Sequence, residues 1–158
     1  MGHLMKLLYI TNGEKQVRKW SIKIDIIPQP KQSTQFSKRG FAYTPAKKRK
    51  YQKALKDAIA ASELPDNLLE GPLSMGIYFC FPLTKSDTAT KKKRQKLEDN
   101  NGWIFASSQK IGDLDNLMKP VSDALNGLVI VDDGHICIAR ITKIKAAKPY
   151  IQINLSEM

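Results

Sequence analysis

The chain has 158 residues, of which 26 are Lys or Arg and 15 are Asp or Glu, so its formal net charge is +11 at pH 7. This length suffices for one domain with a hydrophobic core that needs neither disulfides nor structural zinc. The excess of positive charge favours nucleic acid as the partner, ahead of a membrane surface. The alternative that the charge only keeps the protein in solution is also less favoured.

The sequence disfavours a zinc site, and it also disfavours secretion. Cys80 and Cys137 lie far apart in apolar stretches, where small buried side chains are the better interpretation, and His3 and His135 add little to them. No apolar run approaches the roughly 18 residues that cross a membrane, and the amino terminus lacks the pattern of a secretory signal. We therefore expect a cytoplasmic protein. Residues 1–19 are expected to precede the domain, and residues 1–4 are consistent with a tag remnant.

The first half of the chain predicts a strand, a loop, a helix and a second strand. Residues 20–26 alternate apolar and polar, as in a half-buried strand, and residues 31–41 are polar enough for an exposed loop. Thr44 and Pro45 are typical of a helix start. The apolar stripe of this helix is Tyr51, Leu55, Ala58 and Ile59. In the next strand, the alternating apolar residues are Leu73, Met75, Ile77, Phe79 and Phe81.

From Thr84 to Gly112 the periodicity disappears. This stretch contains four consecutive cations, Lys91 to Arg94, and the apolar group Trp103 to Phe105. A long segment of this kind is usually functional or disordered, so we expect a flexible basic arm over about residues 84–112, with room for a short charged helix.

The last third predicts a helix followed by three strands. A helix over Asp115–Asn126 carries apolar residues on one face and ends at Gly127. A short strand over residues 128–131 ends at Asp132, Asp133 and Gly134, and strands follow over residues 136–145 and 150–155, with a slip between Ile138 and Ile141 that indicates a bulge. The whole order predicts a single α+β domain over residues 20–158, with a mixed β-sheet and packed helices.

The candidate chemistry lies in the acidic residues around the second helix. Asp113 and Asp115 are placed to leave the chain on one side, with Leu114 pointing into the core, while the strand that ends at Asp133 is expected to return toward the start of the helix. Carboxylates held so close need a cation among them, and oxygen ligands without His or Cys suit Mg²⁺ or Mn²⁺. On a basic protein, such an ion suggests phosphodiester hydrolysis.

Lys119 follows Asp115 by one helical turn and shares the polar face with Asp123. There it can stabilise charge on a reacting phosphate, or it can simply pair with Asp123. Structural alternatives exist for the acidic residues too, because Asp before a helix is an ordinary cap and Asp-Asp-Gly is an ordinary turn. Without further information, the active-site and the structural interpretations are about equally favoured.

The run Gly112-Asp-Leu-Asp-Asn-Leu-Met-Lys-Pro-Val-Ser-Asp-Ala-Leu-Asn-Gly127, followed by Asp132-Asp133-Gly134, strongly resembles the RusA family of Holliday junction resolvases. Similar features occur upstream at residues 28–31, 43–45 and 71–73, so the resemblance covers most of residues 20–155. It implies that Asp113, Asp115 and Asp133 bind the catalytic metal, Mg²⁺ or Mn²⁺, and that Lys119 is functionally important. It also implies a homodimer, common in phages and prophages, that makes paired cuts across a four-way DNA junction.

Two segments depart from the family pattern. Residues 32–35 replace a Gly-Arg-Pro-Arg-like stretch, and residues 91–110 form a longer segment than is typical. Both are expected to contact DNA, so these departures bear on junction selectivity. The expected phosphate contacts are Lys31, Lys38, Arg39, Lys47, Lys48, Arg49, Lys91, Lys92, Lys93 and Arg94. Trp103 or Phe105 could wedge against an unstacked base, although anchoring of the arm to the core or to a partner subunit is the favoured role.

We therefore predict a metal-dependent endodeoxyribonuclease that resolves four-way junctions. Two alternatives remain, a nuclease that prefers forks or flaps and a non-catalytic protein that binds branched DNA. A basic RNA-binding module is a third possibility, but the chain lacks the paired aromatic motif of the common RNA-binding folds.

Overall fold

A computed structural model describes residues 17–31, 35–36, 38–40, 42–43 and 46–158 of the chain. Its helices, strands and single-turn 3-10 helices (η) are, in chain order, β1 (Lys19–Ile24), β2 (Gln35–Phe36), β3 (Ala42–Tyr43), α1 (Ala46–Ala60), β4 (Leu73–Pro82), η1 (Lys85–Asp87), α2 (Lys91–Asp99), β5 (Ile104–Phe105), η2 (Gln109–Ile111), α3 (Leu114–Leu125), η3 (Asp133–His135), β6 (Ile136–Ala146) and β7 (Tyr150–Glu157). The predicted helix start at Thr44 and Pro45 lies outside the described residues.

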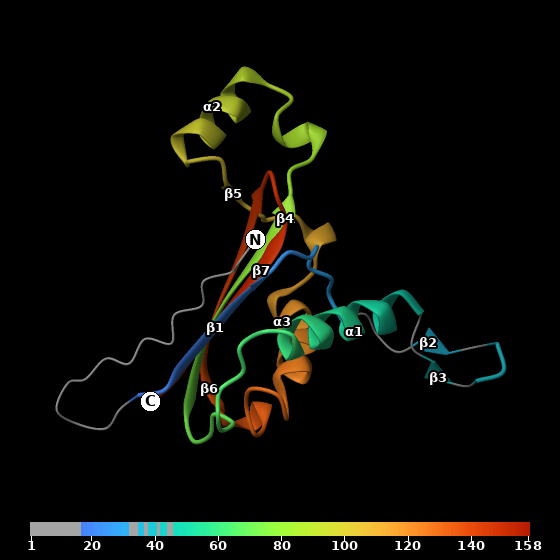
Figure 1. Ribbon diagram of the computed structural model, residues 1–158. Helices are drawn as coiled ribbons and strands as arrows, with labels where there is room; N and C mark the ends of the chain where they lie inside the picture. The colour runs from blue at the N-terminus through green and yellow to red at the C-terminus, as the bar shows by residue number, and fades with distance from the viewer. Residues whose placement is uncertain (1–16, 32–34, 37, 41, 44–45) are drawn as a thin grey trace.

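Five strands form one mixed sheet in the order β1-β7-β4-β6-β5, and β2 pairs with β3 separately. Only β4 and β6 run parallel, while the other neighbours are antiparallel. A parallel pair requires a long crossover, and here it includes α2 and α3. In Figure 1, α1 and α3 lie together beside the sheet and α2 stands beyond its end. The predicted α+β architecture is therefore confirmed.

Strand β4 supplies the middle of the core. Its five alternating apolar residues, Leu73 to Phe81, are all buried, as predicted. The two helices cover them with the apolar stripes that the periodicity indicated: Tyr51, Leu55 and Ile59 on α1 and Leu117, Val121, Ala124 and Leu125 on α3. Gln52 Nε2 donates to the carbonyl oxygen of Pro120 at 2.9 Å and so joins the two helices. None of the described helices is long and apolar enough to span a membrane.

The predictions about strand β6 and the residues before it need correction. Residues 128–131 form no strand ladder; Ile130 makes only isolated bridges with Leu69 and Asn126. The irregularity in β6 lies at Cys137, because the pairing with β4 passes from Leu73↔Ile136 directly to Ser74↔Ile138. An extra residue at a bulge has no partner across the ladder, and Cys137 is accordingly exposed, whereas Cys80 is buried as predicted.

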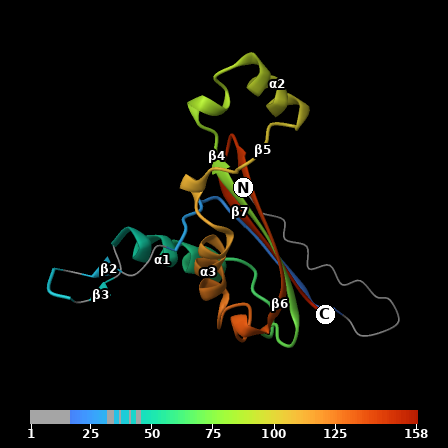
Figure 2. The ribbon, with the colours of Figure 1, turned by 180° about the vertical axis from the view of Figure 1, so that it is seen from behind.

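The segment 84–112 is more regular than the expected flexible arm. Besides the short charged helix α2, it contains η1, η2 and strand β5, which pairs with β6 at the edge of the sheet. The carboxylate of Asp87 accepts hydrogen bonds from the backbone N–H of Thr84 at 2.8 Å and from Lys145 Nζ at 3.0 Å. The contact with Lys145 fastens the segment to β6, and it joins residues too distant in the sequence for local periodicity to reveal. Figure 2 shows α2 beyond the end of the sheet from the opposite side.

Candidate active site at the start of helix α3

The chain enters α3 through a glycine that contacts the loop after β1. Gly112 has a φ of 100°, in the left-handed region that L side chains rarely adopt. A Cβ atom on this residue would lie 2.7 Å from the Cβ atom of Pro30, too close for any real side chain. The carbonyl oxygen of Gly112 accepts a hydrogen bond from Lys143 Nζ at 2.8 Å. The loop and strand β6 thus direct the backbone just before the acidic residues.

Two exposed carboxylates follow at the helix start. Asp113 is the N-cap of α3 in extended conformation, yet its side chain makes no capping hydrogen bond. Asp115 lies in the first helical turn and is also exposed. The structural alternative of an ordinary cap at Asp115 is therefore not supported, because the N-cap position belongs to Asp113 and the carboxylate there accepts no backbone N–H of the first turn. Both carboxylates remain available to a ligand.

The prediction for the residue between them was wrong. Leu114 is 42% exposed and does not enter the core. The buried stripe of α3 begins one turn later, at the fully buried Leu117. Leu114 is therefore exposed together with the two carboxylates that flank it.

Lys119 forms the centre of a charged cluster on the polar face of α3. Its ammonium nitrogen lies 2.9 Å from a carboxylate oxygen of Asp133 and 2.9 Å from one of Asp123. Lys31 reaches the other oxygen of Asp123 at 3.6 Å. Lys119 thus pairs with Asp123, as its structural interpretation predicted, and it also contacts Asp133, which belongs to the predicted catalytic set.

These contacts shift the pKa values of Lys119 and Asp133 so that both side chains stay charged. Hydrogen bonds to Asp133 and Asp123 raise the pKa of Lys119 above its ordinary value. The hydrogen bond from Lys119 is the main reason that the pKa of Asp133 is lowered, against a smaller opposing effect of burial. Lys119 therefore stays a cation, and Asp133 an anion, throughout the neutral range.

A tight turn after α3 brings Asp133 back to the helix. Gly127 has a φ of 74°, and the backbone N–H groups of Leu128 and Val129 both donate to the carbonyl oxygen of Leu125. Asp132 then caps η3, because its carboxylate accepts the N–H of Gly134 at 2.8 Å. Of the acidic pair, Asp132 is thus used in local structure and Asp133 faces Lys119. This turn, rather than the predicted strand, returns the chain as far as Lys119 in the middle of α3, and a return to the start of the helix stays a prediction.

Pro120 leaves a carbonyl of α3 free to bind the loop that precedes β2. A proline lacks the N–H that would normally bond the carbonyl four residues earlier, so the carbonyl of Asn116 is left without its helical donor. That carbonyl instead accepts the backbone N–H of Lys31 at 2.6 Å. The Lys-Pro pair at residues 119–120 therefore has a structural consequence, which is to hold Lys31 beside the cluster. Sequence reasoning had no means of finding this contact or that of Lys143 with Gly112.

The donor chemistry of the predicted metal site fits a hard cation, since all three side chains are carboxylates. Within the part of the chain that the structure describes, however, no three His, Cys, Asp or Glu side chains are grouped closely enough to hold a metal ion. Asp133 is occupied by the Lys119 ammonium. Binding of a metal by Asp113, Asp115 and Asp133 together thus stays a prediction, and it requires Asp133 to exchange this partner.

The predicted DNA-contacting cations lie in two separate regions. Lys31, Lys38, Arg39, Lys47, Lys48 and Arg49 belong to the loop before α1 or to its first turn, and Lys91, Lys92, Lys93 and Arg94 form the first turn of α2. Figure 1 shows the first turns of α1 and α2 on different sides of α3. Lys93 Nζ donates to the carbonyl oxygen of Ser86, and Arg94 to that of Thr88, both neutral groups that leave the positive charges unbalanced.

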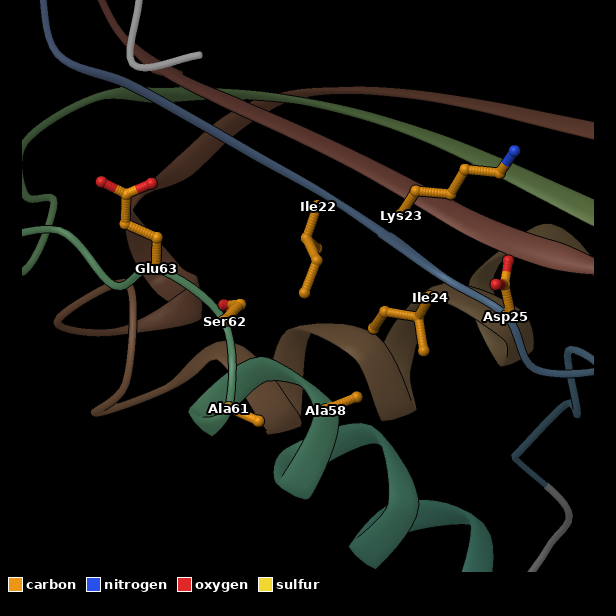
Figure 3. Close-up of a pocket in the computed structure, with 8 residues that line it drawn as sticks. All are labelled: Ile22, Lys23, Ile24, Asp25, Ala58, Ala61, Ser62 and Glu63. Carbon is orange, nitrogen blue, oxygen red and sulfur yellow. The ribbon is translucent and has the colours of Figure 1, made fainter. Parts of the chain in front are cut away.

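A crevice of about 550 Å³ separates β1 from the end of α1, apart from this cluster. Figure 3 shows Ile22, Ile24 and Ala58 between the two elements, with Glu63 turned away from them. None of the predicted catalytic residues lines this crevice. Half of its lining residues are aliphatic, and Figure 3 shows the charged side chains of Lys23, Asp25 and Glu63 spread apart rather than converging as in a catalytic pocket.

Comparisons with known proteins agree with the geometry around α3. The sequence model of the family described as Endodeoxyribonuclease RusA matches residues 25–156, which is most of the chain. A Bacillus subtilis (strain 168) protein, "Uncharacterized protein YqaN", is 32% identical over 111 residues, which cover 70% of this chain and 75% of that protein. The chain therefore belongs to the RusA family of endodeoxyribonucleases, as its motifs predicted.

Proposed function

We propose that the protein is a structure-selective endodeoxyribonuclease that resolves four-way DNA junctions with Mg²⁺, for which Mn²⁺ can substitute. Its membership of the RusA family supports the reaction class. The net charge of +11 supports a polyanionic substrate. A homodimer would suit the two-fold symmetry of a junction, because it presents two equivalent sites.

The observation that carries this proposal is the arrangement of charge along α3. Two exposed carboxylates lie at the start of the helix: Asp113, whose side chain makes no capping contact, and Asp115, which precedes Lys119 by about one turn. Lys119 is in turn bonded to Asp133. These three carboxylates would hold the divalent ion. The ion would polarise the phosphate and generate hydroxide from bound water.

The protein's own groups position the substrate and balance charge. The Lys119 ammonium, still oriented by Asp123 when Asp133 turns to the ion, can donate a hydrogen bond to a phosphate oxygen on which negative charge develops. Asp123 also binds Lys31, whose backbone is tied to Asn116. The loop cation and the helix cation are therefore held at the same face, where both can meet a DNA backbone.

The test uses a labelled four-way junction with Mg²⁺, with a chelator, and with the variant Asp115→Asn. We expect symmetric nicks from the wild-type protein with Mg²⁺ only. The variant should lose roughly 100-fold or more in cleavage rate, while junction binding is retained or tightened because one carboxylate no longer repels phosphate. Asp66→Asn, at an exposed carboxylate in the loop after α1, is the matched control and should cut normally.

Full cutting by Asp115→Asn would refute the assignment of this residue. Binding without any cutting by the wild-type protein would favour a non-catalytic branched-DNA-binding protein instead. Faster cleavage of forks or flaps than of a matched four-way junction would narrow the substrate class. These three results are distinguishable in one gel assay.

A further inference from the structure

A groove of about 450 Å³ lies between α2 and β5, outside the carboxylate cluster. Its lining includes the ion pair of Asp87 with Lys145, whose side chains are each only 14% exposed. Lys93 and Lys96 from α2 also line it, as do Phe105, Ser107 and Ser108. The groove thus combines a neutralised ion pair, two further cations, one aromatic ring and hydroxyl groups.

Phe105 is the feature that most needs explanation. Its side chain is 68% exposed, the highest exposure of the large hydrophobic residues in the described part of the chain. The ring packs edge-to-face on Trp103, with centroids 5.1 Å apart and an interplanar angle of 86°. Trp103 thus supports the ring from one side, so that Phe105 does not serve to anchor the segment in the core. A supported, exposed aromatic ring is a suitable platform for stacking a base.

The charge of the groove matches a phosphate. Lys145 is neutralised by Asp87, whereas Lys93 is bonded to the neutral carbonyl of Ser86. Lys96 is exposed and has no ion pair among the described contacts. An anion in the groove would therefore meet two cations whose charge no carboxylate balances. The hydroxyls of Ser107 and Ser108, which also line the groove, add hydrogen-bond donors.

We propose that this groove binds one unpaired nucleotide of branched DNA, with its base stacked on Phe105 and its phosphate between Lys93 and Lys96. The proposal rests on the proposed function, which supplies DNA as the substrate. The volume lies within the range of pockets that hold a single small molecule, which suits one nucleotide.

The groove lies within reach of the catalytic cluster. Ser108 and Asp113 are five residues apart in the sequence, so their Cα atoms are at most roughly 18 Å apart. This distance corresponds to no more than about five base-pair steps along a strand. A nucleotide that leaves the stack at a branch point and enters the groove would hold the adjoining strand close to Asp113. Selectivity for branched DNA would follow from this spacing.

The experiment measures binding of the full-length protein, in chelator, to a short oligothymidylate, to a four-way junction and to a matched linear duplex. Phe105→Ala should weaken oligothymidylate binding by about fivefold or more and duplex binding by less than about twofold, because one stacking contact is lost. Phe105→Trp should restore binding, since it keeps the stacking surface. Tyr78→Ala removes an aromatic ring that is 45% exposed on another strand and is the matched control, expected to bind all three DNAs normally.

A 2-aminopurine base at the branch point gives an independent readout. Its fluorescence should be more strongly quenched by the wild-type protein than by Phe105→Ala if the base stacks on the ring. Equal binding of oligothymidylate by the two proteins, with junction cleavage intact, would overturn the groove alone. A uniform loss on all three DNAs with dissociation of a dimer would also overturn it, because Phe105 would then contact a second copy. A wild-type protein that neither binds nor cuts a junction would instead refute the proposed function.

Discussion

Lys119 is held by two carboxylates at once, and this double contact distinguishes it from an ordinary surface lysine. Asp123, on the next turn of the same helix, and Asp133, beyond the tight turn, each lie 2.9 Å from its ammonium. Lys53 offers a direct comparison, because it makes a single pair with Asp57 on α1, also four residues away. An exposed pair of that kind contributes little to stability.

We expect Lys119→Ala to lower the rate of junction cleavage by roughly 100-fold, while the affinity for the junction changes by only a few-fold. The physical reason is that the ammonium is placed to stabilise charge that develops during cleavage, and only one of many cations is removed. Single-turnover cleavage at saturating protein measures the rate, and a binding titration in chelator measures the affinity. Lys53→Ala should change neither quantity. A tenfold or greater loss of affinity in Lys119→Ala with an unchanged rate would contradict the catalytic role.

At the scale of elements, the segment that carries α2 depends on one ion pair at its base. Burial raises the pKa of Asp87, but hydrogen bonds from Thr84 and Lys145 outweigh this effect and lower the pKa to about 2. The side chains of Asp87 and Lys145 are both largely buried, so solvent screens the pair only weakly. Because β5 pairs with β6 over only two residues, this ion pair is an important attachment of the segment to the sheet.

Asp87→Asn should therefore loosen the segment without unfolding the core, with a loss of about 2 kcal/mol near neutral pH. A lowered folded-state pKa means that the stabilisation is complete above the ordinary Asp value near 4 and disappears as the pH falls through about 2. Hydrogen exchange of the amides in α2, followed against pH, measures this effect. Asp99→Asn, which neutralises an exposed carboxylate at the end of α2, is the control and should exchange as the wild type does. Equal protection of α2 in wild type and Asp87→Asn at neutral pH would contradict the prediction.

At the scale of the whole molecule, the positive charge is distributed around the acidic cluster of α3. The first turn of α1 and the first turn of α2 carry basic groups on different sides of this helix (Figure 1). We expect the DNA backbone to contact both groups. The many cations also imply that binding is driven largely by release of counterions from DNA.

Junction affinity should accordingly fall steeply with salt, with a slope of the logarithmic plot of about −5 or steeper. Replacing Lys91 and Lys92 by Ala should make the slope shallower by nearly two, because each phosphate contact contributes about −0.9. Replacing Lys19 and Lys53 removes the same charge away from the proposed DNA path and should leave the slope unchanged. A salt-independent affinity of the wild-type protein, or equal slopes for the two double variants, would remove the role of α2 in binding DNA.

Local patterns in the sequence were sufficient for the main elements of the fold. The alternation in β4 and the stripes of α1 and α3 each depend on residues a few positions apart, and burial of those residues confirmed them. The acidic motif at residues 112–119 and the Asp132-Asp133 pair identified the family for a similar reason, because each is contiguous. The strand expected at residues 128–131 and the buried Leu114 were wrong, since short apolar runs do not reveal what covers them.

Only the tertiary structure decided how distant segments meet. It selected Asp133 over Asp132 as the partner of Lys119, bonded Lys31 to the carbonyl of Asn116, and fastened the segment 84–112 to Lys145. Each contact joins residues whose separation in the sequence carries no periodic signal, and each depends on the crossover between the parallel strands β4 and β6. The sequence by itself therefore determined the family and which side chains are predicted to perform chemistry. The fold determined which of them stand together, because long-range contacts arise only once the sheet is formed.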